Sequence, residues 1–162
     1  MLNDKTFAKA SILMIQDPWW GVIGRNKSVD PNMVNIYGTT NSPHWICFTP
    51  PGINGPKGPG VSIYVCRDIP GLIAWFSDLL PPHPNILTVN IIYKGSITTL
   101  VNIYLHGDAY KDSLLHLIQH PIDPLHPISV AGDFNTHHPN WALKGSIWEK
   151  THPNPDACLL EN

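Results

Sequence analysis

The sequence predicts a single domain of the α/β or α+β class, built on a mixed sheet with helices between its strands. Three observations support this prediction. Short apolar and β-branched runs recur along the chain, joined by both hairpins and longer crossovers. The 17 prolines favour short elements and shaped loops over long helices. A length of 162 residues with 43% hydrophobic residues is sufficient for one domain with a core.

Strands are expected where apolar or β-branched runs end at turn-forming residues. They cover residues 12–15, 33–38, 44–48, 61–66, 86–93, 97–105 and 127–131. The two longest runs should form a hairpin with its turn at Lys94-Gly95-Ser96. We expect a loop at residues 19–31, and residues 49–59 contain too many prolines and glycines for regular structure.

Helices are expected at three places, which are residues 3–9, residues 109–119 and the segment that starts at Pro155. Asp108 is placed to cap the second helix, and Pro121 should end it. Its apolar residues fall on one face, at Tyr110, Leu114, Leu117 and Ile118. The third helix has only a few residues before the sequence ends, so the sequence predicts a chain cut inside an element.

The charge balance gives no strong indication of a partner. The net charge is -2, with only 14% charged residues, whereas nucleic-acid-binding domains are usually basic. A local basic stripe or a bound divalent cation can still carry contacts to phosphate. Arg25 and Lys57 lie in expected loops and are candidates for contact with a DNA backbone, with solvated surface charges as the alternative.

The cysteines indicate a reducing environment. Cys47, Cys66 and Cys158 are widely spaced and form no C-x-x-C pair, which predicts free or buried thiols. The first ten residues lack the apolar run of a signal peptide, and no stretch is long enough to cross a membrane. We therefore expect an intracellular protein of the cytoplasm or nucleus without a membrane partner.

Polar side chains follow three of the expected strands. Asp17 ends the first strand, Tyr104 lies near the end of another, and Asp133 and Asn135 follow the last one. Carboxylate oxygens are the ligands that Mg²⁺ prefers, and phosphodiester hydrolysis needs groups that hold a phosphoryl oxygen and a water. Each residue also has a structural explanation, as a turn before Pro18, a packed ring, or a Gly-Asp-x-Asn turn.

The order of these motifs resembles the endonuclease/exonuclease/phosphatase superfamily. The order is Gln-Asp-Pro at residues 16–18, Asn-x-Tyr at 102–104 and Gly-Asp-Phe-Asn-Thr-His at 132–137. The Gln-Asp-Pro-Trp-Trp start and the string GDFNTHHPNW at 132–141 are similar to the endonuclease domain of LINE-like, non-LTR retrotransposons, especially fungal ones. The similarity extends from about Phe7 to Leu160. It implies a two-sheet α/β sandwich of the DNase I-like type, with the site along one edge.

The resemblance implies a role for each matching residue. Asp17 stands where the family has a metal-binding glutamate, for Mg²⁺ or Mn²⁺. Tyr104 matches the tyrosine that contacts the scissile phosphate, and Asp133 matches the aspartate that positions the attacking water. Asn135 matches the asparagine that holds the phosphate, and His137 is a candidate substrate contact. The implied partners are DNA and a reverse transcriptase domain in the same polyprotein.

Departures from the family pattern limit the expected activity. Asp17 is one methylene shorter than glutamate, and a displacement of about 1 Å in a catalytic site can cost on the order of 10²-fold in rate. The family's asparagine before the first motif and its Ser-Asp-His motif near the end have no counterpart here. The resemblance therefore predicts one partial domain, residues 1–162, incomplete at both ends and weakly active or inactive alone.

Two other functions compete with a retrotransposon endonuclease. The first is a superfamily phosphatase acting on a phospholipid or inositol phosphate, which the near-neutral charge permits. The second is a decayed or domesticated remnant that binds but does not catalyse, which Asp17 and the missing ends favour. A DNA-binding titration with and without Mg²⁺ would separate binding from chemistry.

Several aromatic residues also have two explanations. Trp19, Trp20 and Trp45 are able to stack on bases, although packing in the core or anchoring of a loop is the ordinary role. His116 and His120 are spaced to chelate zinc on one helix face, but the segment lacks the glutamate of an H-E-x-x-H site. A structural or surface role is therefore the expectation for these two histidines.

Overall fold

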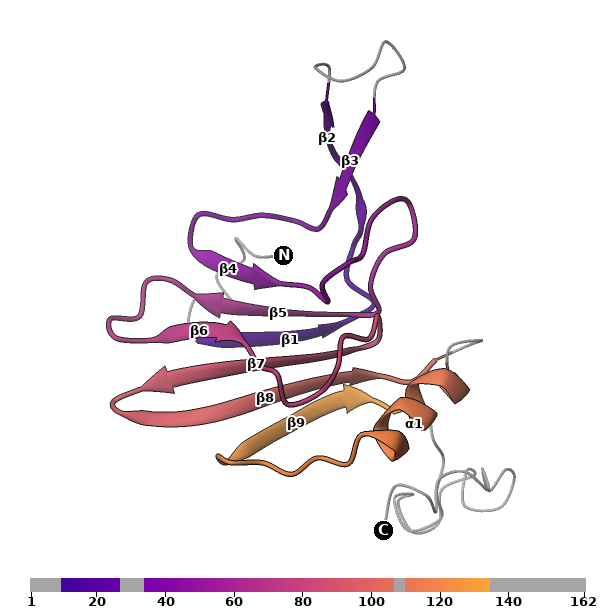
Figure 1. Ribbon diagram of the computed structural model, residues 1–162. Coiled ribbons are helices and arrows are strands. Elements are labelled where there is room, and N and C mark those ends of the chain that lie inside the picture. The colour runs from indigo at the N-terminus through magenta and orange to yellow at the C-terminus, as the bar shows by residue number, and fades with distance from the viewer. Residues whose placement is uncertain (1–9, 27–33, 107–109, 135–162) are drawn as a thin grey trace, which may run out of the picture.

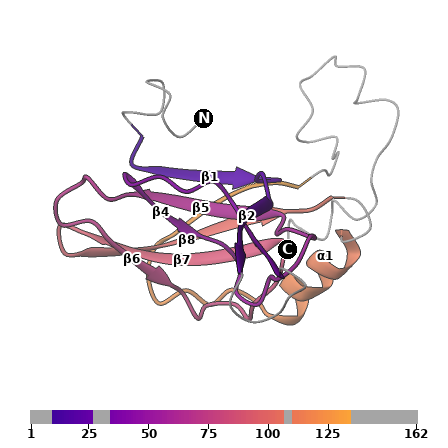
Figure 2. The ribbon, with the colours of Figure 1, turned by 90° about the horizontal axis from the view of Figure 1, so that it is seen from above.

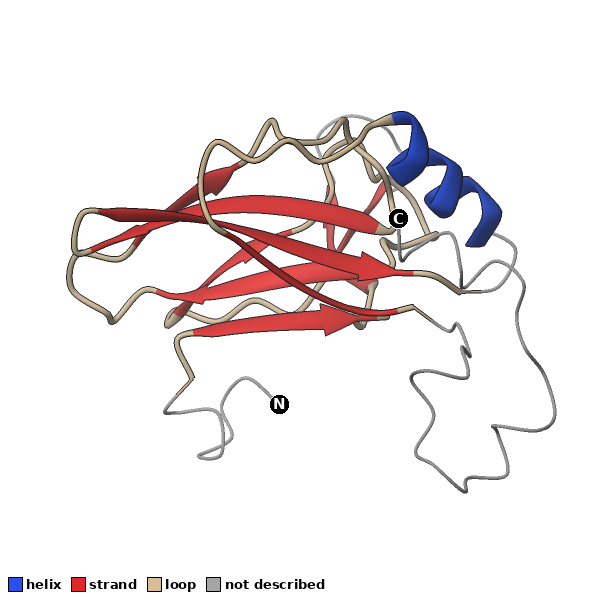
Figure 3. Ribbon diagram, turned by 90° about the horizontal axis from the view of Figure 1, so that it is seen from below, coloured by secondary structure: helices blue, strands red, loops and turns tan. Residues whose placement is uncertain are grey.

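The computed structural model describes residues 10–26, 34–106 and 110–134, and strands dominate these ranges (Figures 1 and 3). The strands are β1 (Ile12–Gln16), β2 (Gly21–Asn26), β3 (Val34–Gly38), β4 (Trp45–Phe48), β5 (Val61–Cys66), β6 (Ile73–Phe76), β7 (Ile86–Tyr93), β8 (Ser96–Tyr104) and β9 (Ile128–Asp133). The one helix in these ranges is α1 (Tyr110–Gln119). The fold is therefore mixed α+β, and the other two expected helices lie outside the described residues.

The strands form three sheets. One contains β1, β5 and β4 in that order, and its pairs are antiparallel. A second contains β6, β7, β8 and β9, with antiparallel pairs except for the parallel pair β8–β9. The third is the hairpin β2–β3, which projects away from the other strands (Figure 1). The mixed pairing that the sequence predicts is thus confirmed in the second sheet.

The two larger sheets share one hydrophobic core, and their strands run along nearly the same direction (Figure 2). Alternate residues of each strand point to the same side. The core therefore takes every second residue of the central strands. Its buried members are Phe48, Val61, Ile63, Val65, Leu87, Val89 and Leu100.

A second core lies on the opposite face of the four-stranded sheet, where α1 packs. Residues of β8 that alternate with the first set, Val101 and Ile103, point toward the helix and meet Tyr110 and Leu117. Ser113 and Leu114 are buried as well. The predicted helix face is wrong at Ile118, which is 52% exposed. The buried stripe includes Ser113, so it is rotated away from Ile118.

Two strands differ from the sequence prediction. Residues 19–31 were expected to form a loop, but residues 21–26 are β2, which pairs with β3 around a bulge between Val22 and Gly24. Strand β6 was not predicted at all, and it pairs with β7 at the edge of its sheet. In both cases the stabilising partner is another strand, which the local sequence does not reveal.

The β7–β8 hairpin confirms its predicted turn. Tyr93 pairs with Ser96, which leaves Lys94 and Gly95 as a two-residue turn with φ of 49° and 79°. Positive φ at both positions is typical of the type I′ turn, whose twist matches that of the strands.

The predicted free thiols are confirmed for Cys47 and Cys66. In the described part of the chain, no helix has the length and apolar character to cross a membrane.

Candidate active site at one end of the sandwich

Three strands from the two larger sheets end at the same side of the molecule. The arrowheads of β1, β8 and β9 point to one end in Figure 1. Strand β8 pairs with β9 in parallel, and Tyr104 stands opposite Asp133. Strand β1 belongs to the other sheet but contacts both β8 and β9. The structure therefore brings together three segments that are far apart in the sequence.

Asn102 ties the end of β1 to the other sheet. Its side chain is fully buried, and its Nδ2 donates to the carbonyl of Ile15 at 3.0 Å and to that of Ser62 at 2.9 Å. Its Oδ1 accepts a hydrogen bond from Nε2 of Gln16. Both protons of the amide are used, so its burial carries no unpaired donor. These bonds hold the two residues that come directly before Asp17.

Asp17 lies in a turn with a strained backbone, and its carboxylate faces outward. Its φ is 48°, in the left-handed region that aspartate tolerates better than most residues. Its backbone N–H donates to the carbonyl of Gly60 at 2.8 Å, and the N–H of Gly60 donates to Pro84 at 2.9 Å. The side chain of Asp17 is exposed. The backbone here is thus fixed while the carboxylate remains open to a ligand.

Tyr104 lies within reach of the charges of both Asp17 and Asp133. Burial raises the pKa of its phenol, and the negative charges of Asp17 and Asp133 raise it further. The ring stacks against His106, with centroids 5.5 Å apart and planes 14° from parallel. At neutral pH the phenol therefore keeps its proton and can donate a hydrogen bond to an anion.

Gly60 permits the close approach of the tyrosine ring to the neighbouring loop. A Cβ at this position would lie 2.8 Å from Cδ1 of Tyr104 and closer still to the amide oxygen of Asn85. Asn85 in turn donates to Oγ of Ser113 on α1 at 3.2 Å. Neither residue was predicted as part of the site, and the only signal was the position of Gly60 between a loop and a strand.

The two carboxylates fit a magnesium ion. Mg²⁺ in phosphoryl-transfer sites is usually held by one or two carboxylates, with waters and substrate oxygens as the other ligands. Asp17 and Asp133 supply such oxygens, and both are close enough to Tyr104 for their charges to raise the pKa of its phenol. Within residues 10–26, 34–106 and 110–134, no three His, Cys, Asp or Glu side chains gather as metal ligands. Asp17 and Asp133 therefore offer carboxylate oxygens at this end, which are the kind of ligand that Mg²⁺ and Mn²⁺ take.

The two predicted basic residues lie on different segments, Arg25 near the tip of the projecting hairpin and Lys57 in the loop before β5. Arg25 is exposed on β2, not in a loop as expected, and pairs with Asn35 across the projecting hairpin. Lys57 is exposed in the loop before β5. Trp20 pins this loop, because its Nε1 donates to the carbonyl of Gly55 at 3.0 Å and its ring lies against Gly58. Lys57 is therefore held close to the chain that leaves Asp17.

The remaining predicted residues, Asn135 and His137, lie outside the described part of the chain. Of the tryptophans with two explanations, Trp45 is buried in the fold and Trp20 anchors a loop, whereas Trp19 is largely exposed.

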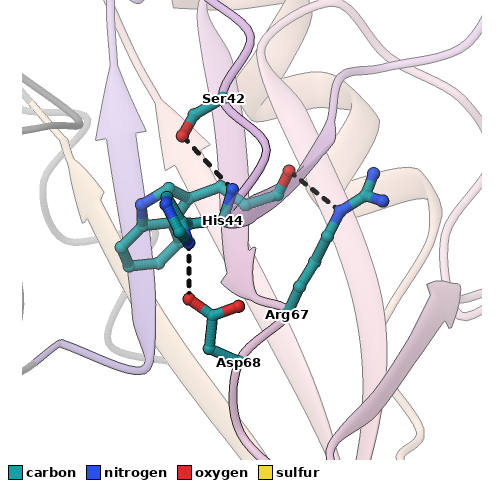
Figure 4. Close-up of polar contacts among 5 residues, drawn as sticks. Ser42, His44, Arg67 and Asp68 are labelled. Carbon is teal, nitrogen blue, oxygen red and sulfur yellow. Dashed lines mark hydrogen bonds and ion pairs between the residues drawn. The ribbon is translucent and has the colours of Figure 1, made fainter.

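A second polar cluster, drawn in Figure 4, lies beside the Trp45–Cys66 pair, whereas Asp17 follows the Gln16–Val61 pair at the opposite end of the three-stranded sheet. His44 and Asp68 form an ion pair at 2.7 Å, and Nε of Arg67 donates to the carbonyl of Trp45 at 3.3 Å. Oγ of Ser42 accepts from the backbone N–H of His44 at 3.4 Å. Because the ion pair is exposed, its contribution to stability is small. These contacts close the ends of β4 and β5 and are remote from Tyr104.

Comparisons with protein-family models, curated proteins and solved structures found no match for this chain.

Proposed function

We propose that this chain is a metal-dependent phosphodiesterase, specifically the DNA endonuclease domain of a non-LTR retrotransposon with a DNase I-like sandwich. The observation that carries the proposal is the convergence of Asp17, Tyr104 and Asp133 on one end of the two sheets. Two carboxylates beside a protonated phenol suit the binding of a metal and a phosphate. The order of the motifs along the sequence supports DNA as the substrate.

In the proposed reaction, a water oxygen bonds to phosphorus and the bond from phosphorus to O3′ breaks. The leaving O3′ takes up a proton from solvent, which gives a 3′ hydroxyl and a 5′ phosphate. Asp133 would orient the water and accept its proton. Tyr104 would donate a hydrogen bond to a non-bridging oxygen as negative charge builds there. Asn135 is proposed to hold the same phosphate. A Mg²⁺ ion held by Asp17 would supply charge neutralisation at the phosphate.

Asn102 and Gln16 are positioning residues in this proposal. They do not reach the phosphate, but their hydrogen bonds fix the chain that leads into Asp17. The fixed position of Asp17 matters because the rate gain from holding reacting groups in place is lost when those groups are displaced by even about 1 Å. The proposal thus assigns the inner residues of the site to support and the outer residues to chemistry.

Nicking of supercoiled plasmid tests the proposed function. We expect a slow, Mg²⁺-dependent conversion to open circles at high enzyme concentration, which EDTA abolishes. Asp133→Asn should slow nicking roughly 10²- to 10⁴-fold, because it removes the base. Tyr104→Phe should slow nicking roughly 10²- to 10³-fold, because it removes one donor to the charged oxygen.

Asp78→Asn is the matched control, since Asp78 is an exposed carboxylate on the loop after β6. It loses the same charge as Asp133→Asn and should nick at the wild-type rate. Wild-type protein that is folded by circular dichroism but shows no metal-dependent nicking would refute the proposed hydrolysis. Equal loss in Asp78→Asn and Asp133→Asn would refute the assigned role of Asp133.

A further inference from the structure

The two tryptophans that follow Asp17 lie in different surroundings. Trp20 is half-buried and anchors the loop that carries Lys57. Trp19 is 59% exposed, the most exposed tryptophan in the described part of the chain, where Trp75 is next at 39%. Tryptophan is usually well buried because of its large apolar surface. Packing therefore explains Trp20 but leaves the exposure of Trp19 without a structural purpose.

The ring of Trp19 is nevertheless supported from one side. A Cβ on Gly21 would lie 2.7 Å from Cζ2 of Trp19 and 3.1 Å from Cη2, so the ring rests directly on the glycine backbone. Gly21 itself is held in the ladder of the projecting hairpin, opposite Gly38. A ring that is held in place loses little conformational entropy when it binds a partner. Trp19 is thus a flat apolar surface that is both exposed and positioned.

The position of this ring relates it to the candidate active site. Only Pro18 separates Trp19 from Asp17, so their Cα atoms are at most about 7 Å apart, which is within the length of one nucleotide. Lys57 is exposed on the loop that Trp20 anchors through Gly55 and Gly58. A positive charge beside a stacking aromatic ring is the combination by which proteins hold single-stranded nucleic acid.

We propose that Trp19 is a stacking platform for an unpaired nucleobase next to the phosphate that Asp17, Tyr104 and Asp133 hold. This inference rests on the proposed function and extends it, because it implies that the enzyme prefers DNA in which a base near the cleavage position is unstacked. Stacking tolerates every base, so the platform adds affinity without sequence preference. Trp19 is a substrate-binding residue in this scheme and takes no part in proton transfer.

Binding measured without cleavage tests the platform. The probe is a labelled single-stranded oligonucleotide of about 12 nucleotides, titrated by fluorescence anisotropy with Ca²⁺ in place of Mg²⁺. Trp19→Ala should bind roughly 5- to 150-fold more weakly than wild type. Trp19→Phe, which keeps a ring, should retain most of the affinity, and Trp75→Ala should bind like wild type.

A second probe separates stacking from a structural effect. It is an oligonucleotide of the same length that carries abasic positions in place of its central bases. Wild type should lose affinity for this probe, while Trp19→Ala should bind both probes equally. The protein must also quench a 2-aminopurine placed at those positions, and Trp19→Ala must not.

Three results would overturn the platform. Wild-type affinity in Trp19→Ala would show that the ring contributes nothing, while the proposed hydrolysis would still be decided by plasmid nicking. Equal weakening of Trp19→Ala on the normal and abasic probes would show that the ring only supports the fold. No binding of either oligonucleotide by folded wild type would overturn the platform, and plasmid nicking would still decide the proposed hydrolysis.

Discussion

At the scale of single residues, Asn102 shows how a buried amide can place a carboxylate on another strand. The side chain joins β8 to Ile15 and Ser62 in the opposite sheet and to Gln16 beside Asp17. The sequence showed Asn102 only as part of a motif with Tyr104. Its hydrogen bonds could not be predicted, because they depend on which strands of the two sheets face each other.

Replacement of Asn102 by alanine should destabilise the protein by about 2–4 kcal/mol, because two buried carbonyls lose their donor and a cavity remains. Urea unfolding followed by circular dichroism measures this change. Asn90→Ala is the matched control, since Asn90 lies on the neighbouring strand β7 and its amide accepts a hydrogen bond from Thr99 at 2.7 Å. A loss in Asn102→Ala no larger than that in Asn90→Ala would contradict the role assigned to Asn102.

At the scale of elements, α1 is joined to the sheet beside a row of three histidine rings, His83, His116 and His120. The centroids of His83 and His116 are 4.8 Å apart, and those of His116 and His120 are also 4.8 Å apart. His116 and His120 were expected to have a structural or surface role. His116 contacts His83, which lies in the loop before β7. His116 therefore helps to attach α1 to the sheet.

These contacts make the attachment sensitive to acid. Burial lowers the pKa of His83 and of His116, and the next ring in the row lowers each further. Asp112 acts in the opposite direction on His83, as does a backbone hydrogen bond at Pro81 on His116. Since the folded pKa lies below the unfolded value, the unfolded chain takes up protons first as the pH falls.

The stability that this row contributes should be complete above about pH 6.5 and should fall as the pH drops toward the lowered pKa values. His116→Gln should therefore flatten the decline of the free energy of unfolding between neutral and mildly acidic pH. Urea titrations across that range measure the slope. His126→Gln changes an exposed histidine and serves as the control. An identical slope in both variants would contradict this account of the row.

The elements also show which local signals are sufficient. Strands β5 and β7 were predicted with the observed ends, because β-branched runs meet strong turn signals there. The hairpin turn at Lys94-Gly95 was predicted for the same reason. Strand β2 contains Gly21 and Gly24, which locally favour a loop, and only pairing with β3 makes it a strand. The edge strand β6 has only four residues and gives a weak signal of its own.

At the scale of the whole molecule, β9 is an edge strand of the four-stranded sheet within the described residues. Val130 is 46% exposed on it, and Ile128 is exposed as well. Exposed apolar residues on an unpaired edge favour association with another chain through strand pairing.

Val130→Lys should therefore reduce association as the protein concentration rises, because a lysine on an edge strand opposes pairing. Sedimentation velocity over a concentration series measures the association. Leu115→Lys adds the same charge at an exposed position on α1 and is the control. If both variants reduce association equally, net charge and not the strand edge is responsible.

The order of the motifs selected Asp17, Tyr104 and Asp133 as candidates, and the fold brings these three residues to one end of the two larger sheets. Their convergence needs the parallel pairing of β8 with β9 and the packing of β1 across from them, which arise from long-range contacts. The exposure of Trp19 was equally hidden, because Trp19 and Trp20 have the same local sequence context and only the loop at Gly55 and Gly58 distinguishes them.

The register of the β8–β9 ladder has a consequence for how the site can fail. Tyr104 stands opposite Asp133, and neighbouring residues of β9 point alternately toward the other sheet and toward α1. A slip of one position would present Gly132 opposite Tyr104 and turn the carboxylate of Asp133 toward the helix. The register of the ladder can change only in steps of one residue. It therefore decides whether the phenol of Tyr104 and the carboxylate of Asp133 lie side by side. A slipped ladder would therefore no longer place the phenol and the carboxylate on the same side of the sheet.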